Sequence, residues 1–495
     1  MTSSTDTHLF DPWLDAAAPQ GVGSSAAAHT GLQIATIENV EPLDAQLGAV
    51  VKKTVPDALH DALFGQPELS PTEIDAAGGD PAAVPPMQTY AVLDAAKIVH
   101  LPDLLADSRL EYRCLFTGDA YDEMKDVAPW VVRLEEGNNF TRRLFTGPKG
   151  VNGLWNKEAG IYVRSRATLE DMWRHFRKFT KVRNNRENWL YLRWWEPSFW
   201  YLALLKQVGQ IQRDLTSPLD ALVVPLELPM FGDRWLSLHT EGEGAGGEHR
   251  LSDEDLKDIR LTTNLRDSLM ILDGFARTRF KGLGVHHTIR FVRHALATAE
   301  HFGLQYRDQT AYLMFVMNFL GSWFWHDPRF PKMADILHSS TLSNHRKIEE
   351  LHAAFSQFST NFIGDDYSLY WAALARTEAK LPPLLENAAS DEAVLRAQVE
   401  CHGRPDVIRH FPAAAFLERS RHAADAIGMS SPRGYRASVI LSYWFGTGYY
   451  NDPLFPWIAE KAGEQRTADS RARSVLAYAL KRMQKTRTLG GHDVL

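Results

Sequence analysis

Between residues 86 and 215, short apolar runs alternate with polar stretches. Five of the runs have the length and the content of β-branched and aromatic residues that are typical of strands: TYAVLDA, YRCLF, WVVRL, GIYVRS and WLYLRWW. In the segment 168–182 the apolar residues have helical spacing instead, and Thr168 with Asp171 forms an N-cap signature ahead of them. Strands that alternate with helices predict an α/β lobe that has a mostly parallel sheet with flanking helices.

From Ser252 onward the apolar positions recur with helical periodicity, which predicts an all-α C-terminal lobe over residues 252–495. Ser252 with Asp255 forms the N-cap signature of its first helix. Between the two lobes, residues 216–251 combine an extended apolar run, LDALVVPLELPMF, with the acidic and glycine-rich stretch EGEGAGGEH. We expect these residues to form a linker.

The helical lobe contains an internal repeat. Residues 291–334 align without gaps with residues 416–459, and the clearest part pairs WHDPRFP with YNDPLFP. Each copy predicts a helix, a glycine that ends it, an apolar helix and an Asp-Pro turn. Glycine is common at the position after a helix, and the residue before a proline disfavours helical backbone angles. The repeat predicts two pseudo-equivalent helical halves, near residues 286–340 and 411–465.

The first 85 residues have a different composition, rich in Ala, Pro, Gly, Ser and Asp. Such a segment buries little apolar surface, so residues 1–85 are expected to be a flexible extension that is partly disordered or lies over another surface. The start, MTSSTDTHLFDPW, lacks the basic and apolar regions of a signal peptide. The longest uncharged apolar run, within residues 310–325, is shorter than the roughly 20 residues that a membrane span needs.

Charge and cysteine content narrow the class of protein further. The net charge of −7 argues against general binding to nucleic acid or to anionic membranes, which needs clustered positive charge. Only two cysteines occur, Cys114 and Cys401, without CxxC spacing. This argues against a disulfide scaffold and a thiolate zinc site, and it fits a reducing compartment. We therefore expect a cytoplasmic protein.

Candidate chemistry is sparse. A predicted helix, HHTIRFVRHALATAEHF, contains His286, His287, Arg290, Arg293, His294 and His301. Of these, His287, Arg290, His294 and His301 lie near one stripe, since spacings of three, four and seven share a face. A metal-binding His pair would have i, i+4 spacing and a carboxylate nearby, whereas Arg290 lies between His287 and His294 and would repel a cation. A solvated or interface-facing stripe fits this pattern better. The basic residues around Trp173, Phe176 and Phe179 are expected to be the solvated face of a packed helix or an electrostatic patch for an acidic partner.

Other motifs also lack the parts that their chemistry needs. The turn GPKGVNG has no Ser or Thr after its lysine to hold the magnesium of a phosphate-binding loop. Cys401 and His402 are consecutive, so on a helix they point apart. The acidic pairs Asp365-Asp366 and Glu349-Glu350 have nothing in the sequence that places them across a cleft. We expect no catalytic residues, no cofactor and no metal.

The segment from residue 90 to residue 200 resembles the adaptors, also called chaperones (Tap or Tec proteins), of type VI secretion effectors. The resemblance rests on five motifs in order: YAVLDAA, CLFTGDA, APWVVRL, GIYVRSRATLEDMWRHFRKFTKV and LRWWEP. Two departures occur in the last motif. Glu196 stands where the family usually has Asp, and Trp194 and Trp195 are bulkier than its usual Phe and Tyr.

This resemblance implies an adaptor that binds a toxic effector in the cytoplasm and helps to load it onto the VgrG spike, directly or through a PAAR or Rhs component, without being an enzyme. The family-motif positions, expected to be structural or partner-binding, are Asp94, Phe116, Gly118, Pro129, Ser165, His175, Arg177, Arg193, Trp194, Trp195, Glu196 and Pro197. Arg193 is expected to form a partly buried ion pair with Glu196 or with Asp94.

Two functions from other classes remain open. One is a hydrolase or transferase whose site combines the His-rich helix with distant carboxylates, and a pocket where His287 or His294 meets a carboxylate or a metal would support it. The other is an immunity protein that neutralises a toxin. The sequence does not identify the effector, the lobe that contacts it or the stoichiometry.

Overall fold

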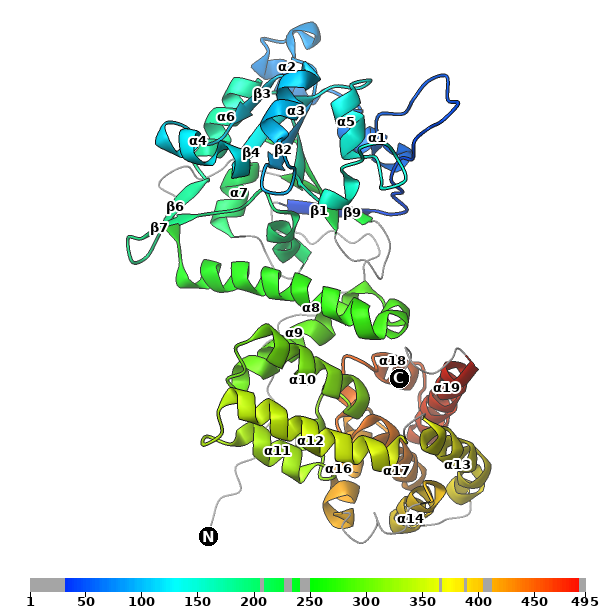
Figure 1. Ribbon diagram of the computed structural model, residues 1–495. Helices are drawn as coiled ribbons and strands as arrows, with labels where there is room; N and C mark the ends of the chain where they lie inside the picture. The colour runs from blue at the N-terminus through cyan, green and yellow to red at the C-terminus, as the bar shows by residue number, and fades with distance from the viewer. Residues whose placement is uncertain are drawn as a thin grey trace. The chain divides into compact units, whose positions relative to one another are not determined.

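The computed structural model describes residues 32–204, 209–226, 234–240, 250–364, 367–386, 390–403 and 412–488 (Figure 1). The chain divides into two compact units, Met1–Arg266 and Asp267–Leu495. The boundary lies inside helix α8 (Asp253–Leu283) rather than at residue 252, where the helical lobe was expected to begin. The expected cap of α8 is present, because the Asp255 backbone N–H donates to Ser252 Oγ at 3.0 Å. The stretch EGEGAGGEH and the pair Asp365-Asp366 lie outside the described residues.

The first unit is built around a sheet of seven described strands in the order β1-β9-β8-β5-β2-β4-β3. Its strands are β1 (Leu32–Ile37), β2 (Gln88–Asp94), β3 (Tyr112–Cys114), β4 (Pro129–Leu134), β5 (Gly160–Ser165), β8 (Ala221–Leu226) and β9 (Arg234–Thr240). A second sheet has the order β10-β6-β7 and consists of β6 (Lys181–Asn184), β7 (Trp189–Tyr191) and β10 (Arg250–Leu251).

The prediction of a sheet with flanking helices is confirmed, but the predicted strand direction is wrong. Every hydrogen-bonded pair of described strands in the large sheet is antiparallel. Helical crossovers do join parallel strands here: β2 and β3 run the same way, as do β4 and β5. However, β4 lies between the first pair and β2 lies between the second. Alternation along the chain therefore predicted the crossovers correctly without revealing the strand inserted between each pair.

Both faces of the sheet are covered. Ala91 and Leu93 pack in one core cluster, and the alternate residues Tyr90 and Val92 are also buried. Continuous apolar strands of this kind are more typical of parallel sheets, which is a second reason for the wrong prediction. The helices of the unit are α1 (Asp57–Phe64), α2 (Pro71–Ala76), α3 (Leu101–Ser108), α4 (Asp119–Met124), α5 (Asn139–Leu144), α6 (Leu169–Arg177), η4 (Pro197–Leu204) and α7 (Gln210–Thr216).

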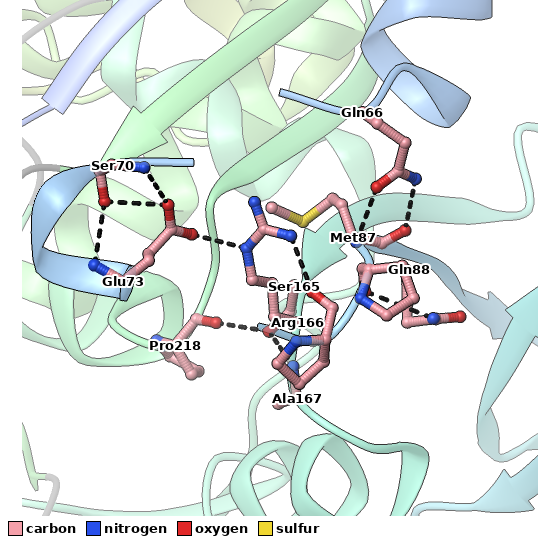
Figure 2. Close-up of polar contacts among 11 residues, drawn as sticks. Gln66, Ser70, Glu73, Met87, Gln88, Ser165, Arg166, Ala167 and Pro218 are labelled. Carbon is pink, nitrogen blue, oxygen red and sulfur yellow. Dashed lines mark hydrogen bonds and ion pairs between the residues drawn. The ribbon is translucent and has the colours of Figure 1, made fainter. Parts of the chain in front are cut away.

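The described part of the segment expected to be a flexible extension, residues 32–85, belongs to the folded unit. β1 pairs with β9 along its length, and Leu59 and Leu63 of α1 are fully buried in the core. Two contacts of Arg166 hold the residues that follow. Arg166 donates to Glu73 of α2 at 2.6 Å (Figure 2). It also donates to the Pro85 carbonyl at 2.8 Å. A composition poor in apolar residues was misleading because a few well-placed leucines and polar contacts suffice to fix the segment. Residues 1–31 lie outside the described part.

The expected linker also belongs to the first unit. Within residues 216–251, β8 pairs with β5 and β9 pairs with β8 and β1, so both strands extend the large sheet. The apolar run LDALVVPLELPMF was correctly interpreted as extended over β8. Its place in the sheet was missed because β5, the strand that joins it to the rest of the sheet, lies more than fifty residues away in the sequence.

The second unit is helical throughout its described residues, as predicted, and its two halves correspond element by element. Adding the offset of 125 to the bounds of α10 (Arg307–Leu320) gives those of α17 (Pro432–Phe445), and η6 (Phe324–His326) likewise gives η7 (Tyr449–Asn451). The other pairs are α9 (Val285–His301) with α16 (Ala413–Ala426), α11 (Pro331–His338) with α18 (Trp457–Gly463), and α12 (Asn344–Phe362) with α19 (Ala468–Thr488). Helices α13 (Ser368–Glu386) and α14 (Asp391–Cys401) connect the halves.

The repeated Asp-Pro turns join the two halves by reciprocal contacts. Asp452 accepts hydrogen bonds from the backbone N–H and the hydroxyl of Ser322, both at 2.6 Å, and Asp327 accepts from the backbone N–H of Thr447 at 3.0 Å. Ser322 and Thr447 are equivalent positions of the repeat. Both aspartates are buried. Each half therefore supplies the carboxylate that caps a loop of the other half. Because equivalent residues make these contacts in both directions, a pseudo-two-fold axis relates the halves.

The two repeated glycines allow this close approach. Gly321 and Gly446 have φ of 91° and 84°, a region that favours glycine. A Cβ on Gly321 would lie 2.7 Å from the Phe445 carbonyl oxygen, and one on Gly446 would lie 2.9 Å from that of Leu320. The two loops thus contact each other by their backbones. Among the described helices, none has the length and hydropathy of a membrane span.

Candidate partner-binding surface

The candidate site in the first unit begins at the end of β2. Asp94 is 1% exposed, and its Oδ1 accepts a hydrogen bond from the backbone N–H of Ala96 at 2.9 Å. Its Oδ2 accepts from Arg193 at 2.5 Å, and Arg193 also donates to Glu196 at 2.5 Å. Burial raises the pKa of Asp94, although the Arg193 guanidinium opposes that shift. Arg193 therefore contacts both of the partners considered from the sequence and neutralises a buried carboxylate.

The residues that follow Arg193 are core residues. Trp194 and Trp195 are 0% and 2% exposed, and Trp194 packs on Phe176 of α6 with ring centroids 4.7 Å apart. The Trp194 carbonyl accepts a hydrogen bond from the indole of Trp200 at 2.8 Å. Pro197 begins η4. The arginine-tryptophan-tryptophan segment is thus fixed beneath the surface, and these indoles are not accessible to a partner.

Gly118 and Pro129 shape the turn before β4. Gly118 has φ 59° and ψ −141°, and a Cβ there would meet no atom within 4 Å, so the backbone angle rather than crowding favours glycine. Pro129 lies opposite Asp94 in the β2–β4 register, and its carbonyl accepts from the backbone N–H of Leu115. Both residues position the chain on either side of α4.

Two more motif residues hold the chain after α7. The Ser165 hydroxyl donates to the Pro218 carbonyl at 2.7 Å (Figure 2), and His175 Nε2 lies 3.0 Å from the Leu215 carbonyl oxygen. These contacts join β5 and α6 to the segment that leads into β8. Like Asp94 and Gly118, Ser165 and His175 have structural contacts.

Arg177 belongs to a cationic cluster around one indole. Its guanidinium lies 4.4 Å from the ring centroid of Trp173, that of Arg113 lies 3.5 Å from the same ring, and Arg177 also donates to the Thr117 hydroxyl at 3.0 Å. Trp173, Phe176 and Phe179 are buried, so the predicted packed face of this helix is confirmed. Arg113 forms an ion pair with Glu170. The cluster presents guanidinium groups over an aromatic ring at the surface.

The adjoining strands β6 and β7 expose a surface that the sequence analysis missed. Trp189 and Tyr191 are 53% and 52% exposed, although each is a large aromatic residue. Lys181 pairs with Tyr191 and Arg183 with Trp189 in the antiparallel register, so the four side chains share one face. The other face carries Val182, which is buried, and the half-buried Leu190.

Cations and aromatic rings alternate on this face. Lys181 Nζ lies 5.3 Å from the Trp189 ring centroid and 5.7 Å from that of Tyr191, and the Arg183 guanidinium lies 4.6 Å from Trp189. Tyr191 also contacts Phe116, with centroids 5.6 Å apart, which connects this face to the last of the motif residues. We call the face made by Lys181, Arg183, Trp189, Tyr191 and Phe116 the hairpin surface.

The hairpin surface has the composition of an interaction site. Exposed tryptophan, tyrosine and arginine are enriched among the residues that dominate protein–protein binding energy. Strand β7 is also at the edge of its three-stranded sheet, where an added strand can pair with it. The sequence did contain a partial signal: the polar stretch after KVRN separates it from the strand-like run WLY by four residues, a spacing that is typical of a hairpin.

The His-rich helix is α9, and its residues do not converge. His294 is buried, against the expectation of a solvated stripe: its Nε2 lies 3.0 Å from the Ser322 carbonyl oxygen, and its ring lies 4.3 Å from Trp323. His287 lies 4.0 Å from Glu460 and is partly buried, which lowers its pKa. In the described part of the chain, no three His, Cys, Asp or Glu side chains lie close enough together to hold a metal ion.

Cys401 and His402 have separate surroundings. His402 is buried, with Nε2 2.9 Å from the Phe362 carbonyl oxygen and Nδ1 3.0 Å from the Tyr443 hydroxyl. The Phe362 carbonyl requires a donor, so Nε2 carries the proton and Nδ1 accepts from the tyrosine. Burial lowers the pKa of His402 to about 4 and raises that of Cys401. The imidazole therefore serves as a neutral core group.

Comparison with protein families yields a match to part of the chain. A family model described as "Domain of unknown function (DUF4123)" matches residues 89–214. The matched range runs from β2 to α7 and contains every family-motif residue named above, together with the hairpin surface. It does not contain β1, β8, β9 or the helical unit. No curated protein and no solved structure matches the chain.

Proposed function

We propose that this protein is a cytoplasmic adaptor that binds a type VI secretion effector and helps to load it onto the VgrG spike, directly or through a PAAR or Rhs component. It carries out no catalytic step of its own. The observation that carries the proposal is the family match at residues 89–214, because the DUF4123 family is associated with type VI effector adaptors. The five motifs quoted from the sequence all lie within that range.

We further propose that the hairpin surface contributes to effector binding. Most family-motif residues have buried structural contacts, whereas Trp189 and Tyr191 are half exposed and lie beside Lys181 and Arg183. A partner segment with apolar and acidic residues would place its apolar side chains on the rings and its carboxylates near the cations. Pairing of an extended segment with the edge of β7 would add main-chain hydrogen bonds.

The direct test is co-expression with the effector encoded beside this protein and with its VgrG, followed by co-purification. We expect the effector to be retained by the wild-type protein. The double substitution Trp189→Ala, Tyr191→Ala should weaken retention at least about tenfold, since central aromatic residues of an interface contribute about 2 kcal/mol or more each. Tyr306→Ala is a matched control, because Tyr306 is also an exposed aromatic residue, at 66%, but belongs to the other unit.

The outcomes separate the competing functions. Failure of every soluble neighbouring effector and VgrG to bind the wild-type protein would contradict the adaptor proposal. Retention that is unaffected by the double substitution would contradict only the role of the hairpin surface. Protection of cells from the toxin, without a requirement for its delivery, would identify an immunity protein instead.

A further inference from the structure

The helical unit contains a cavity of about 460 Å³. This volume is in the range of small-molecule sites. The cavity lies where the two halves of the repeat meet, because Leu320 of the first half and the equivalent Phe445 of the second half both line it. Nearly half of its described lining residues are Phe, Tyr or Trp, against 11% of the whole chain. Aromatic rings therefore decide what the cavity can bind.

Apart from Phe319, the rings of the lining form two groups. The group that we call the first wall has centroid separations of 4.9–6.3 Å between contacting rings and consists of Phe330, Phe358, Phe362, Tyr370, Tyr443 and Trp444. The second wall has separations of 4.8–5.7 Å and consists of Phe445, Phe455, Trp457 and Tyr478. Among the described residues, no ring contact joins the first wall to the second. The cavity therefore separates two continuous aromatic surfaces.

Both walls keep ring surface that solvent can reach. Each wall has three half-buried rings: Phe358, Phe362 and Trp444 in the first, and Phe445, Phe455 and Tyr478 in the second. Exposed apolar surface raises the free energy of the folded state, and contiguous patches of it usually mark binding sites. An aromatic molecule placed between the walls would cover both surfaces at once.

The lining contains cations but, among its described residues, no acidic side chain. Three of the cations lie over rings of the walls, with their guanidinium carbons 5.0–5.9 Å from the centroids: Arg279 over Phe455, Arg329 over Phe330 and Tyr443, and Arg482 over Trp457 and Tyr478. The face of an aromatic ring attracts positive charge, and the protein's own guanidinium groups already use that attraction here. A cationic ligand would be repelled by these groups, and no carboxylate of the described lining would compensate for the repulsion.

We propose that the cavity binds a planar aromatic molecule of two or three fused rings that carries no positive charge, inserted between the first and second walls. Offset stacking and edge-to-face contacts stabilise aromatic pairs beyond the burial of their surface. The first wall already contains both geometries, since Phe358 and Phe362 are stacked at 22° and Tyr370 meets Trp444 edge-on at 86°. The site is independent of the adaptor proposal, because it uses none of the residues of the hairpin surface.

The test is calorimetric titration of the full-length protein with 2-naphthol. Decahydro-2-naphthol is the matched probe, because it has the same carbon skeleton and hydroxyl group but no π-system. A naphthalene that carries a trimethylammonium group tests the exclusion of cations. 2-Naphthol should bind with one-to-one stoichiometry and at least about tenfold more tightly than either other probe, since it can stack and carries no charge. Equal affinities for the three probes would overturn the proposal.

Substitution of a wall residue separates stacking from general burial. Phe358→Leu and Phe455→Leu each keep an apolar side chain but remove one ring from one wall. Each should reduce the preference for 2-naphthol over decahydro-2-naphthol to about threefold or less, while the affinity for the saturated probe changes by less than about twofold. Phe315→Leu is the matched control, because Phe315 is also a half-buried ring of the helical unit but does not line the cavity. An unchanged preference in both wall variants would contradict binding between the walls.

A blocking variant tests the location. Gly282 lines the cavity in α8, and a Cβ there would meet no atom within 4 Å, so the substitution Gly282→Phe can fill part of the cavity without a clash. It should weaken 2-naphthol binding at least about tenfold. Gly274→Phe is the matched control, since Gly274 is also a helical glycine of α8 with open surroundings but does not line the cavity. Equal loss of binding in both glycine variants would place the site elsewhere and overturn the proposal.

Discussion

The two units use the same device, a buried aspartate that accepts backbone hydrogen bonds, in different ways. In the first unit Asp94 caps its own turn at Ala96 and binds Arg193, so one carboxylate fixes one end of one strand. In the helical unit Asp327 and Asp452 each cap a loop of the opposite half. Loss of the Asp94 contacts affects only the end of one strand. Loss of a contact from Asp327 or Asp452 affects the packing of both halves of the helical unit. The helical unit should therefore respond more strongly than the first unit when one aspartate is lost.

Asp327→Ala is expected to have the largest effect. The substitution leaves the buried Arg329 guanidinium without its carboxylate and the Thr447 N–H without an acceptor. Removal of one partner of a buried ion pair costs about 3–5 kcal/mol, because the remaining charge stays desolvated. Denaturant unfolding, with hydrogen exchange to locate the loss in residues 267–488, measures the effect. Asp335→Ala, an exposed aspartate of the same half, is the control and should change stability by less than about 0.5 kcal/mol.

Acid should affect the helical unit through His402. An unfolded histidine takes up a proton near pH 6.5, whereas burial keeps His402 neutral until about pH 4. Between these values the unfolded state binds more protons, so stability falls as pH falls from about 6.5 to about 4, by about 3 kcal/mol at most.

Denaturant unfolding at several pH values checks this loss. The variant His402→Gln should reduce the slope, because glutamine can still donate to Phe362 and accept from Tyr443. Part of the slope should remain, because burial also lowers the pKa of His326 to about 4. If the free energy of unfolding of the variant fell with pH as steeply as that of the wild-type protein, the assignment to His402 would be contradicted.

The first unit has a group that responds to acid at lower pH. Backbone contact with Ser70 and the Arg166 guanidinium lower the pKa of Glu73 to about 2, so its contribution is lost only below about pH 4.5.

Arg193→Ala is expected to have a moderate effect, confined to the first unit. Asp94 would lose its charged partner but keep its hydrogen bond from Ala96, and Arg193 is 45% exposed, so solvent already weakens the pair. A loss of about 1–2 kcal/mol is expected. Thermal unfolding that resolves the two units measures it, with Arg174→Ala, an exposed arginine of α6, as the control. Unchanged stability and unchanged effector binding would remove any role for this ion pair.

The smallest effect on stability is expected at the hairpin surface. Trp189→Ala with Tyr191→Ala removes half-exposed rings that cover little of the core, so stability should change by about 1 kcal/mol or less. The same variant is the one that should lose effector binding. A large loss of stability would instead make these rings part of the fold, and the comparison between buried motif residues and an exposed binding face would fail.

Local signals in the sequence predicted local structure well. The caps at Thr168 and Ser252, the packed face of α6 and the repeated Asp-Pro turns all occur as expected, since each depends on residues a few positions apart. The repeat carried more information than a single copy. It predicted two equivalent halves, and the structure adds that they contact each other through the very residues that are identical, Gly321 and Asp327 with Gly446 and Asp452.

Features that depend on residues far apart in the sequence could not be predicted from local patterns. Strand direction depends on which strand lies between β2 and β3, and burial of His294 depends on Trp323 and Ser322 of a neighbouring loop. The exposure of Trp189 and Tyr191 was missed for a related reason. Aromatic residues in a short apolar run are usually core residues, and only the strand register shows that these two share a solvated face with Lys181 and Arg183.

The reciprocal aspartate caps also constrain how the helical unit folds. Ser322 and Asp452 are 130 positions apart, so the loop of the first half remains without its carboxylate until the second half has been synthesised. Contacts of such long range make folding slow, because the chain loses the entropy of closing a large loop before the stabilising contacts form. The first half should therefore emerge from the ribosome in an incomplete state with exposed apolar surface, and the unit should acquire its stability late and in one cooperative step.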